Sequence, residues 1–230
     1  MGLSDELIGE VDKIFKNDWN IREGSKVPEP EDIKLGNEGV KIDATVLYAD
    51  LDGSTNLVDS YKPEFAAEIY KAYLYCAAKI IKSEGGTITA YDGDRVMAIY
   101  IGDSKNTSAV KTALKINYSV LKIINPAIKK QYQSSSYEIK QVVGIDFSQL
   151  IAARTGVRGN NDIVWVGRAA NYAAKLSSYQ ATHSTRITKK VYDNMADLVK
   201  YSNNLNMWEV DPISLKGENI YRSTYYWTID

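Results

Sequence analysis

The stretch "VLYADLDGST", from Val46 to Thr55, leads an apolar segment directly into two aspartates, a glycine and two hydroxyl residues. The apolar and β-branched residues at its start predict a buried strand. An Asp-Gly pair after a strand is typical of an ordinary turn, and that interpretation is favoured when the pair stands alone. The alternative is a strand end that binds a divalent metal ion and a phosphate chain.

A second acidic motif, "DGD" at residues 92–94, changes the balance between these two interpretations. It separates "TITAY" (87–91) from "RVMAIYI" (95–101), two segments that read as the strands of a β-hairpin. The motif therefore predicts a hairpin with Asp94 at its tip.

The rest of the chain predicts an alternation of helices and strands. In order, these are a helix from Pro63 to Gly85-Gly86, a helix from about 107 until Pro126 interrupts it, one or two strands in 137–153, a strand, glycine turn and alanine-rich helix in 162–179, a short helix at about 188–196, and strand-like "NMWEV" and "YYWTI".

The order strand, helix, hairpin, helix, strand is that of the split βαβ, or ferredoxin-like, fold. This α+β architecture has an antiparallel sheet with helices on one face. The other face of the sheet is left free, and a free apolar face suggests a dimer. We expect residues 1–40 to form an N-terminal helix and connector, and residues 41–230 to form one catalytic domain.

Composition excludes several classes of protein. The 230 residues are 44% hydrophobic and 25% charged with a net charge of −1, which favours neither nucleic-acid binding nor an anionic membrane surface. One cysteine and one histidine cannot supply a Cys/His zinc site. Without a signal-peptide core or an apolar run of membrane-spanning length, we expect a cytoplasmic protein that does not insert into a membrane.

In a ferredoxin-like sheet the first strand lies beside the hairpin, so Asp50 and Asp94 can point at one spot. Two hard oxygen ligands suit Mg²⁺ or Mn²⁺, with the backbone carbonyl of Leu51 and substrate phosphates completing the shell. Backbone amides in the turn formed by Asp52, Gly53, Ser54 and Thr55 can line a phosphate. The chain has no Walker lysine motif, which excludes a P-loop NTPase.

Four motifs in this order resemble the catalytic domain of class III nucleotidyl cyclases. They are "YADLDGST" (48–55), "DGDRVMA" (92–98), "VWVGRAANYAAK" (164–175) and "SLKG" (214–217), and the resemblance covers residues 43 to 227. It implies that two metal ions per site are held by Asp50, Leu51 and Asp94, and that the ribose 3′-hydroxyl attacks the α-phosphate so that pyrophosphate leaves.

The same resemblance gives roles to three later residues. Asn171 would orient the ribose, Lys175 would neutralise charge on the α-phosphate, and Lys216 would hold the terminal phosphates. The family usually has arginine where Lys175 stands, and lysine lacks the bidentate fork of arginine. Family geometry places Asn171 and Lys175 on the partner subunit, which implies a homodimer with shared active sites.

The base-reading positions depart from the purine cyclases of the family. Those enzymes read adenine with a lysine and an aspartate where this chain has Ala90 and Val164, and neither side chain can hydrogen-bond a base. Tyr48 and Tyr91 are bulky enough to narrow the pocket for a pyrimidine, although core or cross-strand packing explains them equally well.

The phrase "VGRAANYAAKLSS" resembles soluble bacterial pyrimidine cyclases of the Pycsar antiphage type. This resemblance implies a uridylate or cytidylate cyclase whose product activates a separate effector, and we expect UTP rather than CTP as substrate. The alternatives are an adenylate cyclase with an unusual pocket, a silent homologue that binds nucleotide or a partner, and a polymerase-palm or diguanylate-cyclase-like domain on the same fold.

Overall fold

The computed structural model describes residues 2–229, which divide into two compact units. The larger unit contains Ala44–Ser148 and the chain from Arg168 onward, and the smaller contains the chain up to Asp43 together with Gln149–Gly167. The four motifs fall mainly in the larger unit. No helix among residues 2–229 combines the length and the apolar character needed to cross a lipid bilayer.

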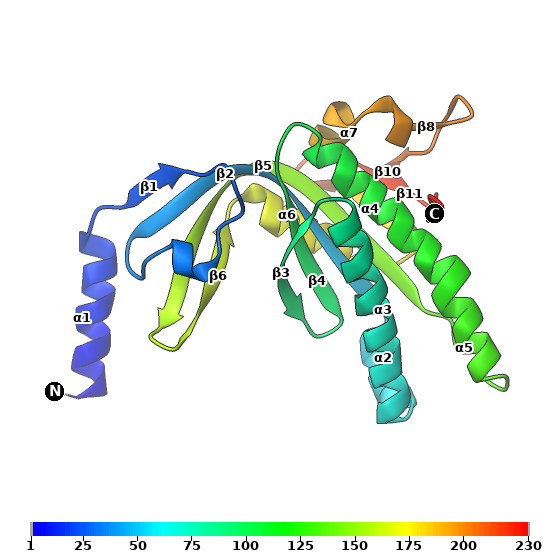
Figure 1. The fold of residues 1–230 in the computed structure, drawn as a ribbon, viewed down its shortest axis with the longest axis horizontal. Coiled ribbons are helices and arrows are strands. Elements are labelled where there is room, and N and C mark those ends of the chain that lie inside the picture. Colours follow the sequence, from blue (N-terminus) through cyan, green and yellow to red (C-terminus); the bar gives the residue numbers. More distant parts are fainter. Residues whose placement is uncertain (1, 230) are drawn as a thin grey trace. The chain divides into compact units, whose positions relative to one another are not determined.

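The larger unit is built on a sheet with the strand order β10-β11-β7-β5-β2-β4-β3 (Figure 1). Its strands are β2 (Glu38–Asp52), β3 (Thr87–Asp92), β4 (Arg95–Tyr100), β5 (Lys140–Val157), β7 (Thr185–Thr188), β10 (Glu209–Leu215) and β11 (Glu218–Ser223). Strand β4 is antiparallel to both β2 and β3, whereas β5 and β7 are parallel. The segment β5-β2-β4-β3 has the ferredoxin-like order, which confirms the predicted fold class.

Helices and two short strands complete the larger unit. They are α2 (Ser54–Ser60), α3 (Pro63–Ser83), α4 (Lys105–Ser119), the π-helical turn η2 (Val120–Ile124), α5 (Asn125–Gln131), α6 (Arg168–Ser177), α7 (Lys189–Asn194), the 3₁₀ turn η3 (Asp197–Val199), β8 (Tyr201–Ser202) and β9 (Leu205–Asn206).

The smaller unit has fewer regular elements. They are α1 (Leu3–Lys16), β1 (Asn20–Glu23), the 3₁₀ turn η1 (Pro30–Asp32), the start of β2, the end of β5, and β6 (Asn160–Val166). Strand β1 runs parallel to the start of β2, and β6 forms an antiparallel hairpin with the end of β5.

The main core lies between α3, α4 and one face of the sheet (Figure 1). Alternate residues of β2, among them Leu47 and Ala49, point into this core together with Val96 of β4. Period-2 alternation explains the pattern, because successive strand residues face opposite sides of a sheet. Pro63 begins α3 at a position where its missing N–H costs nothing, and Tyr73 lies fully buried in the middle of that helix.

Helix α6 packs against the opposite face of the same sheet, so the expectation from the sequence that helices cover one face and leave the other free was wrong. Val143 and Ile145 of β5 point into the main core, so the residue between them, Gly144, faces the other side. A Cβ at Gly144 would overlap the Ala173 carbonyl and lie 2.5 Å from the backbone nitrogen of Ser177. The glycine therefore allows α6 to approach the sheet at backbone contact distance.

We expect Gly144→Ala to lower the free energy of unfolding by about 2–3 kcal/mol, because the added methyl meets helix backbone that cannot rotate away. Urea unfolding followed by far-UV circular dichroism measures this loss. Gly9→Ala in α1 is the matched control, because no atom lies within 4 Å of its new Cβ, and we expect it to stabilise the chain slightly. Equal effects of the two substitutions would contradict the close approach of α6.

Candidate active site

Asp50 and Asp94 come from two strands that are neighbours in the sheet. Asp50 lies near the end of β2, and Asp94 lies just before β4, where Gly93 turns the chain with a φ of +61°. Ala49 of β2 pairs with Val96 of β4, and the two strands are antiparallel. Asp50, which follows Ala49, and Asp94, which lies two residues before Val96, are therefore at the same end of the sheet. The structure thus places both aspartates where the strand order predicted.

The carboxylate of Asp94 acts on that of Asp50. Burial, and then the negative charge of Asp94, raise the pKa of Asp50 from its ordinary 3.8 to about 6, while Arg95 opposes this shift. One oxygen of Asp94, Oδ2, is buried without a hydrogen-bond partner, and so is the hydroxyl of Tyr73 on α3. Burial and the charges of both aspartates raise the pKa of Tyr73. This end of the sheet therefore holds two carboxylates, and the Asp94 Oδ2 atom has no hydrogen-bond donor from the described residues.

These groups fit a divalent cation that takes only part of its shell from the protein. A buried carboxylate oxygen without a partner is costly unless a cation or donor occupies the adjacent space. Residues 2–229 contain no cluster of three or more His, Cys, Asp or Glu side chains able to enclose a metal ion. Two carboxylates therefore suit Mg²⁺ or Mn²⁺, which keep water and substrate oxygens in their shells, better than a fully enclosed metal.

The raised pKa of Asp50 predicts a pH-dependent penalty in the metal-free protein. Folded Asp50 retains its proton up to about pH 6, whereas the unfolded chain loses it near 3.8, so stability falls as the pH rises through this window. Because the side chain is only half-buried, we expect Asp50→Asn to stabilise by about 1–2 kcal/mol at pH 7.5, rather than the full value of the shift.

Thermal unfolding in the presence of a chelator at pH 7.5 and pH 4 tests this expectation. The melting temperature of Asp50→Asn should exceed that of the unmodified chain at the higher pH by about 4 °C, and the difference should nearly vanish at the lower pH. A gain that is independent of pH would contradict a raised pKa of Asp50, caused by burial and then by the charge of Asp94.

The turn after Asp50 has the conformation expected of a phosphate-binding segment. Gly53 has a φ of +76° and caps α2, whose first-turn amides have no partner within the helix. Asp52 and Thr55 are exposed and Ser54 is half-buried, while the side chain of Leu51 is buried in the core. The predicted role of the Leu51 backbone carbonyl as a metal ligand stays a prediction.

Tyr48 lies two residues before Asp50 on β2, on the same side of the strand, and Arg95 covers its ring. The guanidinium of Arg95 stacks 5.3 Å from the centre of the Tyr48 ring, and its Nη2 donates to Asp92 at 2.6 Å. The Nε of Arg95 is buried and makes no hydrogen bond. Burial raises the pKa of Tyr48, and the charge of Arg95 opposes the shift. Sequence reasoning missed Arg95, although it directly follows the "DGD" motif.

The remaining base-reading candidates are on strands. Ala90 is exposed on β3 and pairs with Met97 just beyond a β-bulge, and Tyr91 beside it is 56% exposed, so core packing does not explain that ring. Val164 is 40% exposed on β6 of the smaller unit, where it pairs with Ala153.

Asn171 and Lys175 occupy one exposed face of α6, four residues apart. The opposite face of the helix is buried through Ala169, Ala173 and Leu176. No hydrogen bond or ion pair within the described part of the chain joins Asn171 or Lys175 to the aspartates. Their exposure leaves both side chains available to a partner subunit.

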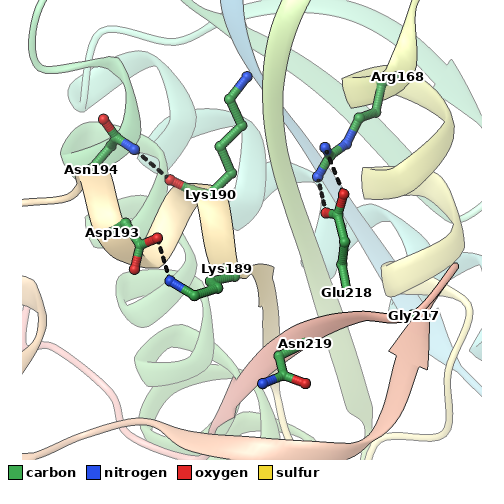
Figure 2. Close-up of a pocket in the computed structure, with 8 residues that line it drawn as sticks. All are labelled: Arg168, Lys189, Lys190, Asp193, Asn194, Gly217, Glu218 and Asn219. Carbon is green, nitrogen blue, oxygen red and sulfur yellow. Dashed lines mark hydrogen bonds and ion pairs between the residues drawn. The ribbon is translucent and has the colours of Figure 1, made fainter.

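Lys216 is at the tip of the β10–β11 hairpin. Leu215 pairs with Glu218, so Lys216 and Gly217 form a two-residue turn, and both have positive φ, +49° and +81°. A pocket of about 480 Å³ adjoins this turn (Figure 2). The pocket is lined by Arg168, Lys189, Lys190, Asp193, Asn194, Gly217, Glu218 and Asn219.

The whole chain is similar in sequence to known nucleotidyl cyclases. The family model for the adenylate and guanylate cyclase catalytic domain matches residues 39–229, which include all four motifs. A uridylate cyclase of Xanthomonas perforans is 53% identical and one of Burkholderia cepacia is 52% identical, each over the full length of both chains. These matches confirm the resemblance drawn from the motifs and the prediction of an enzyme.

Solved structures agree on the fold. The crystal structure of the adenylyl cyclase CyaB from P. aeruginosa superimposes with a TM-score of 0.67 and 22% identity, covering 81% of this chain and 95% of that one. The guanylyl cyclase Cya2 gives the same TM-score at 17% identity, covering 82% of this chain and 95% of its own. At such low identity, this likeness concerns the fold alone.

Proposed function

Because the chain belongs to the adenylate and guanylate cyclase catalytic domain family, and is therefore a nucleotidyl cyclase, we propose that it is a cytoplasmic uridylate cyclase that converts UTP to 3′,5′-cyclic UMP and pyrophosphate. The observation that carries the proposal is the full-length match to two proteins named uridylate cyclase. Each match covers the whole of this chain and the whole of the relative, at 53% and 52% identity.

The residues at the base-reading positions support a pyrimidine substrate. Ala90 and Val164 offer no hydrogen bond to a purine, and a pocket without its polar readers loses most of its discrimination for that base. Tyr48 lies two residues before Asp50 on β2, with the Arg95 guanidinium over its ring, and its bulk leaves less room for a base. Uracil is smaller than a purine.

The reaction forms one bond and breaks one. The ribose 3′-oxygen bonds to the α-phosphorus, the bond from that phosphorus to the bridging oxygen breaks, pyrophosphate leaves, and the 3′-hydroxyl proton passes to solvent. Asp50, Asp94 and the Leu51 carbonyl would hold two divalent ions, Mg²⁺ or Mn²⁺, whose chemistry when bound is to acidify the 3′-hydroxyl and to bind the triphosphate.

The other residues of the site bind and orient the nucleotide. Backbone amides between Asp52 and Thr55 line the phosphates, and Lys216 binds the terminal ones. Asn171 orients the ribose, and Lys175 neutralises the charge that develops on the α-phosphate. Because Asn171 and Lys175 are exposed on α6, we assign them to the active site of a second copy, in a homodimer with two shared sites.

Incubation of the purified protein with ATP, GTP, CTP and UTP, first with Mn²⁺ and then with Mg²⁺, tests the substrate. We expect cyclic UMP from UTP, identified by mass and retention against authentic standards. Cyclic CMP or cyclic AMP as the main product would show that CTP or ATP is the preferred substrate, and the protein would still be a nucleotidyl cyclase. Tight binding of nucleotide without any cyclic product would favour a silent homologue.

The resemblance to Pycsar cyclases supports a role in antiphage defence, with cyclic UMP as the signal to a separate effector. Cells that express this protein should accumulate cyclic UMP after phage infection, and cells that express Asp94→Ala should not. Unchanged cyclic UMP levels throughout infection would contradict this role.

A further inference from the structure

Arg168, the first residue of α6, links three separate elements of the larger unit. Its Nη2 donates to Oε2 of Glu218 at 2.7 Å and its Nη1 donates to Oε1 at 3.3 Å, a bidentate pair with the first residue of β11 (Figure 2). Its Nε donates to Oδ2 of Asp146 on β5 at 3.1 Å. The guanidinium thus joins α6, the β10–β11 hairpin and the central sheet.

The Asp146 end of this linkage is a rigid anchor. The Asp146 side chain is fully buried, and its Oδ1 accepts from the hydroxyl of Thr188, the residue that caps α7, at 2.5 Å. A charged side chain inside an apolar strand is retained only where it is paired. The ring of Tyr172 lies 4.6 Å from the guanidinium and fixes its plane. The position of the Arg168 fork is therefore set by the sheet and by α6 together.

The Glu218 end acts on the exposed two-residue turn of the β10–β11 hairpin. Lys216 has a φ of +49°, a conformation that costs a residue with a Cβ about 1 kcal/mol or more and that the paired ends of the hairpin impose. Lys216 and Gly217 are both exposed, and Glu218 immediately follows them. A bidentate contact at Glu218 restricts the turn more narrowly than a single hydrogen bond would.

We infer that Arg168 is a positioning residue that, anchored on Asp146, holds Glu218 and thereby fixes the Lys216 turn relative to the first turn of α6, which carries Asn171. The inference rests on the proposed function, in which Lys216 binds the terminal phosphates and Asn171 binds the ribose of one nucleotide. The distance between these two groups has to match the length of the nucleotide, and a displacement of about 1 Å is enough to lose much of the binding.

The pair contributes position more than stability. The side chains of Arg168 and Glu218 are 31% and 50% exposed, and exposed ion pairs add little to the free energy of unfolding. Loss of the bidentate contact between Arg168 and Glu218 should therefore leave the fold intact and weaken the affinity for the nucleoside triphosphate. This separation of effects makes the inference testable.

The test measures binding of α,β-methylene UTP, which cannot cyclise, by titration calorimetry in the presence of Mg²⁺. We expect Arg168→Lys, which keeps the charge and loses the fork, and Glu218→Gln each to weaken binding about tenfold with little change in melting temperature. In the Lys216→Ala background, Arg168→Lys should cause no further loss, because Arg168 acts through Lys216. If Arg168 had a purely structural role, independent of Lys216, the losses of affinity caused by the two substitutions would multiply.

Arg222→Lys is the matched control. Arg222 also pairs with a glutamate of the hairpin, but through one hydrogen bond, from Nε to Oε1 of Glu209 at 2.8 Å, at the end of the β10–β11 hairpin remote from the turn. We expect this variant to bind the analogue as tightly as the unmodified chain. Equal affinities for Arg168→Lys and Arg222→Lys, or losses that multiply in the double variant, would overturn the inference.

The same samples separate this inference from the proposed function. A chain that binds the analogue but makes no cyclic UMP from UTP would refute the activity and leave the comparison of Arg168 and Lys216 valid. A chain that makes cyclic UMP and is unaffected by Arg168→Lys would refute the positioning role alone.

Discussion

Asp50→Ala and Asp94→Ala should each abolish cyclic nucleotide formation, with a loss of at least about 10³-fold in kcat. Each change removes one of two carboxylates that lie at one end of the sheet, and the described residues contain no cluster of three or more His, Cys, Asp or Glu side chains that could bind the metal ions instead. Initial rates of cyclic UMP formation from UTP measure the effect.

The fold should survive both substitutions. The pKa of Asp50, raised to about 6, shows that its charge is unfavourable without a cation, so its removal should not lower the melting temperature. Added Mn²⁺ should raise the melting temperature of the unmodified chain and leave that of Asp50→Ala unchanged, a readout independent of activity.

Asp103→Asn is the control for Asp94→Ala, because Asp103 is exposed just beyond the other end of β4. It should retain normal activity and the normal response to Mn²⁺. Substantial turnover by either alanine variant would contradict the assignment of the metal site to Asp50 and Asp94.

Two inactive variants should restore activity when they are mixed. Asp50→Ala removes a residue of one half of the proposed shared site, and Lys175→Ala removes a residue of the other half. If subunits exchange freely at equal concentrations, half of the dimers are mixed, each has one intact site of two, and activity returns to about a quarter of normal. Cyclic UMP formation before and after mixing measures the recovery.

The matched controls are mixtures of two variants that both alter the same half of the shared site. Asp50→Ala with Asp94→Ala, and Asn171→Ala with Lys175→Ala, leave no site intact in any combination of subunits. Neither mixture should recover activity. If Asp50→Ala and Lys175→Ala also failed to recover after verified subunit exchange, a site formed within one chain would replace the shared one.

Several expectations from the sequence were accurate because local rules governed them. The "VLYAD" strand, the hairpin around "DGD" and the helix from Pro63 follow alternation, turn chemistry and helical spacing, and the structure has each of them. The strand order then brought Asp50 and Asp94 together, because the ferredoxin-like topology leaves little freedom in how these strands pair.

Two expectations were wrong where tertiary contacts outweighed local preference. Pro126 was expected to interrupt its helix, but a π-helical turn at Val120–Ile124 leads into α5, with the proline in the first turn, where no N–H is needed. The tail "YYWTI" forms no strand. Instead, the Trp227 backbone N–H donates to the Leu114 carbonyl of α4 at 3.1 Å.

By itself, the sequence determined the family, the ferredoxin-like order and the identity of the two aspartates, because short motifs and periodic patterns record local chemistry. Only the tertiary structure revealed that Arg168 joins Asp146 to Glu218 and that Arg95 covers Tyr48. Asp146 and Glu218 lie 22 and 50 residues from Arg168 along the chain. Contacts between residues so far apart in the sequence depend on how helices and turns pack against the sheet. Side-chain type and spacing along the chain do not determine that packing.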